Sequence, residues 1–293
     1  MTRKLAKLIL VLMLTICASA FAEPKLNVLI IDGQNNHNWR ATTPILQRIL
    51  KDADLFTVEV ATSPADDEEF NKWDPDFAAY DVVLSNYNGK MWPESMREGF
   101  EKFVADGGGV VIVHAANNAF SGWKEYNEMI GLGWRGAGFG DRVTFNDEGK
   151  SVRTSKGGGP GAGHGPQHDF TIIVRDDSHP VTRGMPREWL HAKDELYHGQ
   201  RGPAANMEIL ATAYSAKDKG GTEAHEPMIW VIPYGKGRVF TTVMGHADYS
   251  MTCSGFATTV QRGAQWAATD KVTLKIPDDF PSTDKVTVRD LKD

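Results

Sequence analysis

The chain is poor in cysteine, with only Cys17 and Cys253 among its 293 residues. Cys17 lies in an N-terminal segment that we expect to be removed, so that one cysteine would remain and no intramolecular disulfide could form. A domain without disulfides must be held together by its apolar core. A chain of this length can bury a core large enough to do so.

The sequence also has no excess of positive charge, because 32 lysines and arginines stand against 38 aspartates and glutamates, for a formal net charge of −6. The two signs are interspersed, which argues against nucleic acid or an anionic membrane surface as a partner. After the N-terminal segment there is no second long apolar run, and the sequence has no internal repeat or low-complexity tract. We therefore expect a globular protein that is not inserted in a membrane.

The N-terminal segment has the pattern of a secretory signal peptide. Basic residues precede an apolar run over Leu8–Cys17, and Ala20-Phe21-Ala22 forms a small-x-small cleavage site. The run is too short for a spanning helix. We expect a signal peptide over residues 1–22, a single domain over residues 23–293, and a periplasmic or secreted location. A lipoprotein signal at Cys17 is the alternative, but Ile16 precedes it, where a small residue is normally required.

The most informative stretch is a short apolar run that ends in polar residues. Gly107-Gly108-Gly109 leads into four β-branched residues, Val110–Val113, and His114 follows at once. A run without a polar face is typical of a strand buried on both sides, as in a parallel sheet covered by helices. Ligands of such sheets bind beyond the carboxyl ends of the strands, so we expect a site at His114.

Strands and helices alternate through the first half of the chain, which predicts an α/β fold with a flavodoxin-like, doubly wound, mainly parallel sheet. The second half is less regular, and we expect it to elaborate the same domain. Strands are predicted at 26–32, 56–60, 80–85, 110–113, 170–174, 208–212, 228–232 and 238–243. Helices are predicted around 45–50 and 96–104 and at 120–130 and 256–268, whereas 131–166 is expected to be mostly loop.

Two glycine-rich segments have the letters of nucleotide-binding motifs without their context. Gly131–Gly136 has the dinucleotide-binding spacing, but it follows a helical segment instead of a strand. Gly157–Gly165 lacks the Lys-Ser/Thr ending of a phosphate-binding loop. We therefore expect no nucleotide cofactor. The second segment is expected to be a flexible surface loop, or a lid if His164 contributes to a site.

Three histidines, His37, His114 and His246, follow predicted strands and should share one edge of the sheet. With Glu195 they form the predicted catalytic acid/base centre, because imidazole and carboxylate groups can transfer protons near neutral pH. The same four residues are the expected ligands if a divalent metal ion is bound. No His-x-x-x-His pair marks a metal site, so both roles stay open. A different interpretation is that Asp194 and Glu195 cap a helix or pair with surface lysines and arginines.

Aromatic and amide side chains near these positions are the predicted substrate-binding residues. The rings of Trp39 and Tyr197 suit the apolar faces of a sugar. Asn117, Asn118 and His198 can hydrogen-bond its hydroxyl groups. Aromatic residues in such loops also serve as packing residues, and this alternative stays open.

Five motifs together resemble the ThuA-like (trehalose utilisation) family over nearly the whole mature chain. They are Gly33–His37, Gly109–His114, Ser178–Gly184, Asp194–Tyr197 and Pro233–His246. The resemblance implies a class I glutamine amidotransferase-like fold of flavodoxin type and a link to sugar catabolism. An amidotransferase needs a cysteine at the turn where this chain has His114, and Gly-x-Ser-x-Gly is also absent. Glutamine amidotransferase chemistry is therefore excluded.

These observations predict an exported ThuA-like protein of carbohydrate catabolism. We expect an enzyme that acts on a sugar or keto-sugar derivative by histidine and glutamate acid/base chemistry, with or without a divalent metal ion. Hydrolysis, elimination and isomerisation all suit such residues, because each needs a base and a group that stabilises developing negative charge. The alternative is a non-catalytic carbohydrate-binding protein on the same fold.

Overall fold

One half of the sheet consists of five parallel strands. The computed structural model describes residues 24–291, so the predicted signal peptide lies outside the described residues. The strand order β2-β1-β3-β4-β13, with every neighbouring pair parallel, is flavodoxin-like and confirms the predicted doubly wound fold. These strands are β1 (Leu26–Asp32), β2 (Phe56–Thr62), β3 (Val82–Ser85), β4 (Gly109–Val113) and β13 (Gly237–Thr242).

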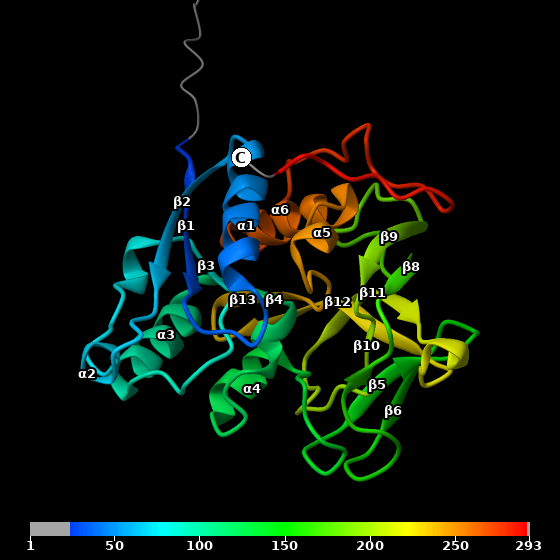
Figure 1. Cartoon of the computed structure of the whole chain (residues 1–293), viewed down its shortest axis with the longest axis horizontal. Coiled ribbons are helices and arrows are strands. Elements are labelled where there is room, and N and C mark those ends of the chain that lie inside the picture. The colour runs from blue at the N-terminus through cyan, green and yellow to red at the C-terminus, as the bar shows by residue number, and fades with distance from the viewer. Residues whose placement is uncertain (1–23, 292–293) are drawn as a thin grey trace, which may run out of the picture.

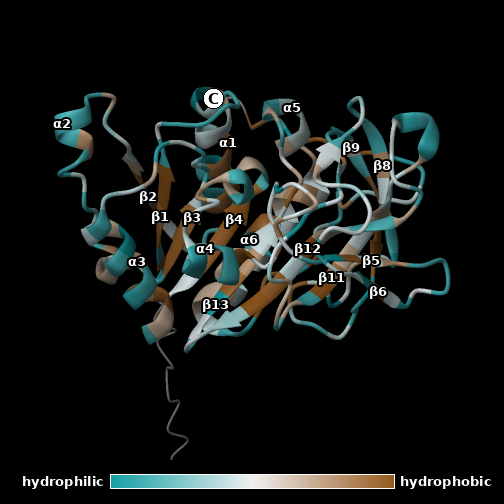
Figure 2. Cartoon of the chain, turned by 90° about the horizontal axis from the view of Figure 1, so that it is seen from below, coloured by the Kyte–Doolittle hydropathy of each residue, from teal (hydrophilic) through white to brown (hydrophobic). Residues whose placement is uncertain are grey.

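Helices cover both faces of this parallel half (Figure 1). α1 (Trp39–Asp52) and α6 (Ser254–Thr269) pack on one face, and α3 (Glu94–Asp106) and α4 (Lys124–Ile130) pack on the other. All five residues of β4 are buried between the two layers, which explains why this strand has no polar side chain. Figure 2 shows the hydrophobic residues concentrated in the strands, with hydrophilic residues on the outer surfaces of the helices.

Shorter helices connect these elements. They are α2 (Asp67–Phe70), α5 (Asp248–Met251) and the 3-10 helices η1 (Phe77–Ala79), η2 (His114–Asn118) and η3 (Lys217–Lys219). The helix predicted at 120–130 begins only at Lys124, because Phe120 has a φ of 56°, which an α-helix cannot contain. Within residues 24–291, no helix combines the length and apolarity needed to cross a bilayer.

Antiparallel strands extend the sheet beyond β13. β12 pairs with β13, and β11, β8 and β9 follow in that order, while β5 pairs with β12 and β6 with β5. A separate pair joins β7 to β10. The bounds are β5 (Arg142–Phe145), β6 (Ser151–Thr154), β7 (Gly163–His164), β8 (His168–Val174), β9 (Glu188–Asp194), β10 (Tyr197–His198), β11 (Glu208–Tyr214) and β12 (His225–Tyr234).

Segment 131–166 is mostly loop, as expected, but it also contains the short strands β5, β6 and β7, which were not predicted. β6 is short and mostly exposed, so it lacks the apolar run by which the other strands were predicted. β9 was also not predicted. Its buried positions include His191 and Asp194, so the sequence shows no apolar periodicity there.

The direction of β9 is important for the position of the site. Each of the steps from β13 through β12, β11 and β8 to β9 is antiparallel, and four reversals return the chain to its first direction. β9 therefore runs the same way as β4 and β13. Its carboxyl end and the residues after it reach the same edge of the sheet.

Candidate functional site

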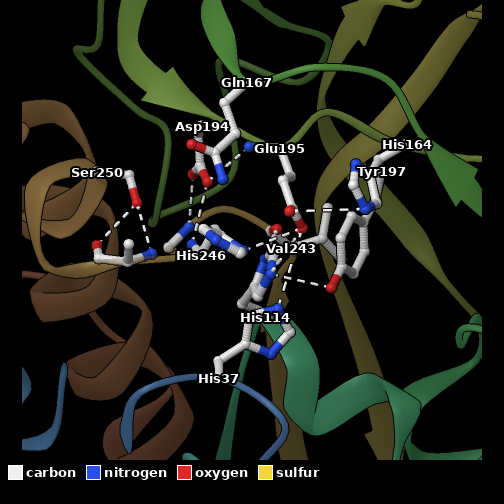
Figure 3. A network of polar contacts seen from close by, with 12 residues as sticks. His37, His114, His164, Gln167, Asp194, Glu195, Tyr197, Val243, His246 and Ser250 are labelled. Atoms are coloured by element: carbon white, nitrogen blue, oxygen red, sulfur yellow. Dashed lines mark hydrogen bonds and ion pairs between the residues drawn. The ribbon is translucent and has the colours of Figure 1, made fainter. Parts of the chain in front are cut away.

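Four segments bring the predicted acid/base residues together at the carboxyl edge of the sheet (Figure 3). His37 lies in the loop after β1, His114 directly follows β4, and His246 lies in the loop after β13. Glu195 lies between β9 and β10. Topology explains the three histidines, because neighbouring parallel strands present their carboxyl ends at one edge. The direction of β9 explains Glu195.

The three imidazole rings are in mutual contact around the Glu195 carboxylate. Their centroids are 4.8 Å apart for His37 and His114, 4.7 Å for His37 and His246, and 5.5 Å for His114 and His246. From Glu195 Oε2, the distances are 3.0 Å to His246 Nδ1, 3.6 Å to His114 Nε2 and 4.0 Å to His37 Nε2. One nitrogen from each ring and one carboxylate oxygen all lie within 4.8 Å of one another, which is a spacing from which a metal ion could be bound.

His114 is held in a strained backbone conformation at the end of the buried strand. Its φ is 44°, in the left-handed region that residues other than glycine seldom adopt, at a cost of about 1–3 kcal/mol. The side chain is buried, and its Nδ1 lies 2.7 Å from the carbonyl oxygen of Val243. Nδ1 therefore carries the proton and donates it to that carbonyl. Nε2 is the acceptor, and the Tyr197 hydroxyl donates to it over 2.9 Å.

His37 has the same arrangement of its two nitrogens. Its Nδ1 lies 3.2 Å from the side-chain oxygen of Asn35, an atom that can only accept. The proton is therefore on Nδ1, and Nε2 faces the Glu195 carboxylate. Since Asn35 also accepts from the His37 backbone N–H over 3.0 Å, both the ring and its loop are fixed by one side chain.

Asp194 positions two of the four residues. It is fully buried and accepts hydrogen bonds from the backbone N–H groups of Glu195, Gly245 and His246 over 2.8, 2.7 and 3.0 Å. Its Oδ2 also lies 2.7 Å from Nε2 of the buried His191. The alternative that Asp194 and Glu195 are surface capping or pairing residues was therefore wrong. A single carboxylate joins the end of β9 to the loop after β13.

The surroundings shift the pKa values of the clustered residues in different directions. Burial alone would raise the pKa of Glu195, but its close contacts with His114 and His246 hold that pKa well below its usual range. Burial, followed by the neighbouring His114 and His246, lowers the pKa of His37 to about 4. Burial also opposes the charged form of His246, yet its contact with Glu195 raises the pKa of that imidazole above its ordinary value.

His164 is a further member of the site. Its Nε2 lies 3.6 Å from Oε1 of Glu195, the carboxylate oxygen away from the other three histidines. The pairing of β7 with β10 places His164 opposite Tyr197, so this end of the predicted loop 157–165 is anchored in the fold. In the sequence, the only sign of this residue was a histidine within a glycine-rich segment.

Three of the five predicted substrate-binding residues lie near the histidine cluster, and two do not. Trp39 begins α1, half-buried beside the His37 loop, with the Arg40 guanidinium 4.2 Å from the centre of its ring. Tyr197 contacts His114 directly, and the half-buried Asn118 lies beside the same hydroxyl.

The other two predicted binding residues have structural partners. Asn117 is fully buried, and its amide donates to Gln200 over 2.5 Å, so it does not face a ligand. His198 follows Tyr197 in β10 and therefore leaves the opposite face of the strand, where Nδ1 lies 3.2 Å from the Ser215 hydroxyl.

A separate groove of about 680 Å³ lies at the opposite edge of the sheet, near the amino ends of β3 and β4. It is lined by residues such as Asp81, Gly107 and Phe103, and it contains no histidine or cysteine. The groove therefore offers no acid/base set comparable to the one at the carboxyl edge.

Comparisons with known proteins agree with this fold. The profile of a family described as ThuA, trehalose utilisation, matches residues 27–267. A ThuA-like protein from Parabacteroides merdae, whose crystal structure is known, has 42% sequence identity to this chain. The two structures superimpose with a TM-score of 0.86, over 91% of this chain and 98% of that one. A ThuA-like protein from Bacteroides uniformis is 18% identical with a TM-score of 0.57, covering 87% and 96%, and shares the fold. No curated protein matches the chain.

Proposed function

The chain belongs to the ThuA, trehalose utilisation, family, and from this premise we propose that it is an enzyme acting on a sugar or keto-sugar derivative. His37, His114, His246 and Glu195 would form its acid/base centre. The observation that supports this most strongly is the convergence of three imidazoles, from three separate segments, on one carboxylate oxygen from a fourth segment.

The protonation states suit proton transfer. Glu195 is held as a carboxylate, and the raised pKa of His246 favours its protonated form. A carboxylate and an imidazole with a raised pKa thus lie 3.0 Å apart. Removal of a proton next to a carbonyl or hydroxyl-bearing carbon, with protonation of a nearby oxygen, requires such a pair. Isomerisation and elimination of a sugar derivative include these steps, whereas in hydrolysis the base would act on the attacking water and the acid on the leaving oxygen.

The surroundings of the cluster suit a carbohydrate. The Trp134 ring lies 4.6 Å from that of Tyr197 and 5.7 Å from that of His164, measured between centroids. Aromatic faces next to polar groups are the surfaces against which sugar rings pack. Trp39 lies at the start of the helix that follows the His37 loop, and it would contribute a further ring.

The proposal is tested with a panel of sugars and keto-sugars, using calorimetry for binding and product analysis for turnover. We expect turnover of at least one compound, reduced about 10²–10⁴-fold in Glu195→Gln, since that is the usual contribution of a general acid or base. His168→Ala is the control, because this histidine lies in β8 and bonds to Pro166 instead of the cluster. Binding without any product would support the alternative, a non-catalytic carbohydrate-binding protein.

We also propose that the enzyme works in the periplasm or outside the cell. The support is the sequence pattern of residues 1–22, with its basic start, apolar run and small-x-small cleavage site. A sugar-active enzyme in that location would meet its substrate before uptake.

A further inference from the structure

We propose that His37, His114, His246 and Glu195 bind one divalent transition-metal ion. The inference rests on the same site as the proposed function and deepens it by naming a cofactor. It is carried by the directions in which the nitrogen lone pairs point, by the spacing of the four groups, and by the hydrogen bond that a metal ion would replace.

The proton positions of two histidines point to a cation. In His114 and His37 the Nδ1–H donates to an oxygen of Val243 or Asn35, which leaves a lone pair on Nε2. The Nε2 atoms of His114 and His37 lie 3.6 and 4.0 Å from the Glu195 carboxylate, which is negative. Lone pairs and a carboxylate repel one another unless a positive ion lies between them. Histidines that bind metals usually donate their second N–H to a carbonyl or carboxylate in this way.

The geometry of His246 supports the same centre. Its Nδ1 lies 3.0 Å from Glu195 Oε2, yet this buried nitrogen is not aligned for a hydrogen bond with any partner. Both atoms belong to the set of four that lie within 4.8 Å of one another. Asp194 fixes this arrangement, because it accepts from the backbone N–H of both residues.

The spacing fits a small metal ion. Bonds of about 2.0–2.1 Å in a tetrahedral site place the ligand atoms about 3.4 Å apart. The distances from Glu195 Oε2 to the three imidazole nitrogens are 3.0, 3.6 and 4.0 Å, which scatter around that value. The widest separation in the set, 4.8 Å, would have to close by about 1.4 Å when the ion binds.

The ligand set selects the class of metal. Three imidazoles and one carboxylate favour Zn²⁺ or another late first-row ion such as Fe²⁺, Co²⁺ or Ni²⁺. Mg²⁺ and Ca²⁺ prefer oxygen ligands and are not expected to compete. His164 faces the other carboxylate oxygen of Glu195, Oε1, so His164 is not one of the four ligands. It would lie beside the coordination position that these ligands leave open.

Tyr197 provides a consequence that distinguishes this proposal from simple proton transfer. Its hydroxyl donates to His114 Nε2 over 2.9 Å, which is the lone pair that the metal ion would take. The ion must therefore displace the hydroxyl, which would then be free to donate to an oxygen ligand in the open position. Removing the hydroxyl should strengthen metal binding, since the metal would no longer compete with a hydrogen bond.

The test is calorimetric titration of the chelator-treated protein with Zn²⁺ and, separately, with Co²⁺. We expect one ion per chain, visible ligand-field bands for Co²⁺, and a higher melting temperature with the ion, because an ion that binds only the folded state stabilises it. Glu195→Gln and His37→Ala should weaken binding by at least tenfold. Tyr197→Phe should strengthen it about fivefold, the effect of one competing hydrogen bond.

Two controls make the outcome decisive. His168→Ala should bind as the wild type does, and His164→Ala should change the affinity by less than threefold, because neither residue is a ligand. Melting each variant without metal shows whether it is folded. A chain that binds no stoichiometric ion, or a Glu195→Gln variant that binds as the wild type does, would overturn the proposal.

The experiment also separates this inference from the proposed function. Stoichiometric binding without sugar turnover would retain the metal site and remove the enzymatic proposal. Turnover by a wild-type protein that binds neither ion would retain acid/base catalysis and remove the metal site.

Discussion

His114 combines a strained backbone with a buried, hydrogen-bonded ring, and these features have opposite effects on stability. The left-handed φ disfavours folding, whereas the bond from Nδ1 to the Val243 carbonyl favours it. A structural residue gains nothing from the strain, because an asparagine or glycine would adopt the same conformation more easily. The strain is therefore best explained by the direction it gives to Nε2, toward Glu195 and Tyr197.

We predict that His114→Ala remains folded and loses turnover. The loss of the ring leaves the Val243 carbonyl without its donor, which should lower the free energy of unfolding by about 1–3 kcal/mol. Turnover of the identified sugar should fall by about 10²–10⁴-fold. Urea unfolding and product analysis measure the two effects. If the variant is insoluble or melts without cooperativity, His114 is a structural residue and the site is misassigned.

His191 should make the free energy of unfolding fall as the pH rises above neutral. Burial opposes its charged form, but the contact with Asp194 outweighs burial and raises the pKa of His191 to about 9. A raised pKa stabilises the fold fully below the unfolded pKa of about 6.5, and this stabilisation is lost as the pH rises toward 9. The contribution of His191 to the unfolding free energy should therefore fall by about 1–2 kcal/mol between pH 6.5 and 8.

The matched variant is His191→Gln, whose amide can still donate to Asp194 but does not titrate in this range. We expect it to lose about 1–2 kcal/mol less than the wild type over pH 6.5–8. His246, whose pKa is also raised, is present in both proteins, so its contribution cancels. Burial disfavours the thiolate of Cys253, yet the neighbouring His191 lowers the pKa of this thiol, which therefore contributes with the opposite sign as the pH rises. Equal slopes for the two proteins would show that His191 is not charged in the fold.

At the scale of the elements, the sequence predicted the parts of the site that depend on simple strands. β1, β4 and β13 are apolar runs that end in polar residues, so their histidines could be assigned to one edge. β9 could not be found, because buried His191 and Asp194 break its apolar pattern. The approach of Glu195 therefore stayed unexplained, since it depends on the direction of a strand with buried polar residues.

The junction between β9 and the loop after β13 should depend on the charge of Asp194. In Asp194→Asn, an NH₂ group would replace an oxygen that now accepts from backbone N–H groups or from His191. Breaking a buried ion pair in this way typically costs about 3–5 kcal/mol. Chemical denaturation of the variant measures this effect. Asp169→Asn, at an exposed position in β8, is the control and should change stability by less than about 0.5 kcal/mol.

At the scale of the whole molecule, the site lies where the parallel and antiparallel halves meet. His37 and His114 come from the parallel half, and Glu195 follows the last antiparallel strand. α6 packs on β4 and β13 and also contacts β9, which explains why nearly all of its residues are buried. A ligand that binds the three histidines and Glu195 would thus contact both the parallel and the antiparallel half of the sheet.

The predicted export of the protein has a direct measurement. We expect the mature chain to begin at Glu23, because Ala20-Phe21-Ala22 has the small residues that signal peptidase requires. Mass spectrometry of the protein recovered from the periplasm or medium gives its N-terminus. A chain beginning at a lipid-modified Cys17 would show a different processing site, and a full-length chain confined to the cytoplasm would exclude export.

The prediction of a single domain can be tested by a substitution that disturbs the contact between α6 and β9. Gly255 in α6 lies against Trp189 of β9, so close that an added Cβ would be 2.5 Å from the indole ring. Gly255→Ala should therefore separate the two elements and cost about 1–3 kcal/mol, as overpacked cores do. Gly122→Ala is the control, because no atom lies within 4 Å of the added Cβ.

If the two halves unfold as one unit, Gly255→Ala should lower the midpoint seen by every probe by the same amount. Far-UV circular dichroism follows the secondary structure of both halves, and tryptophan fluorescence follows rings on both sides of the junction, including Trp123 in the parallel half and Trp230 in β12. Unfolding curves that coincide in the wild type and shift together in the variant would establish one cooperative domain. A variant in which fluorescence and circular dichroism separate into two transitions would instead show two units that meet at the site.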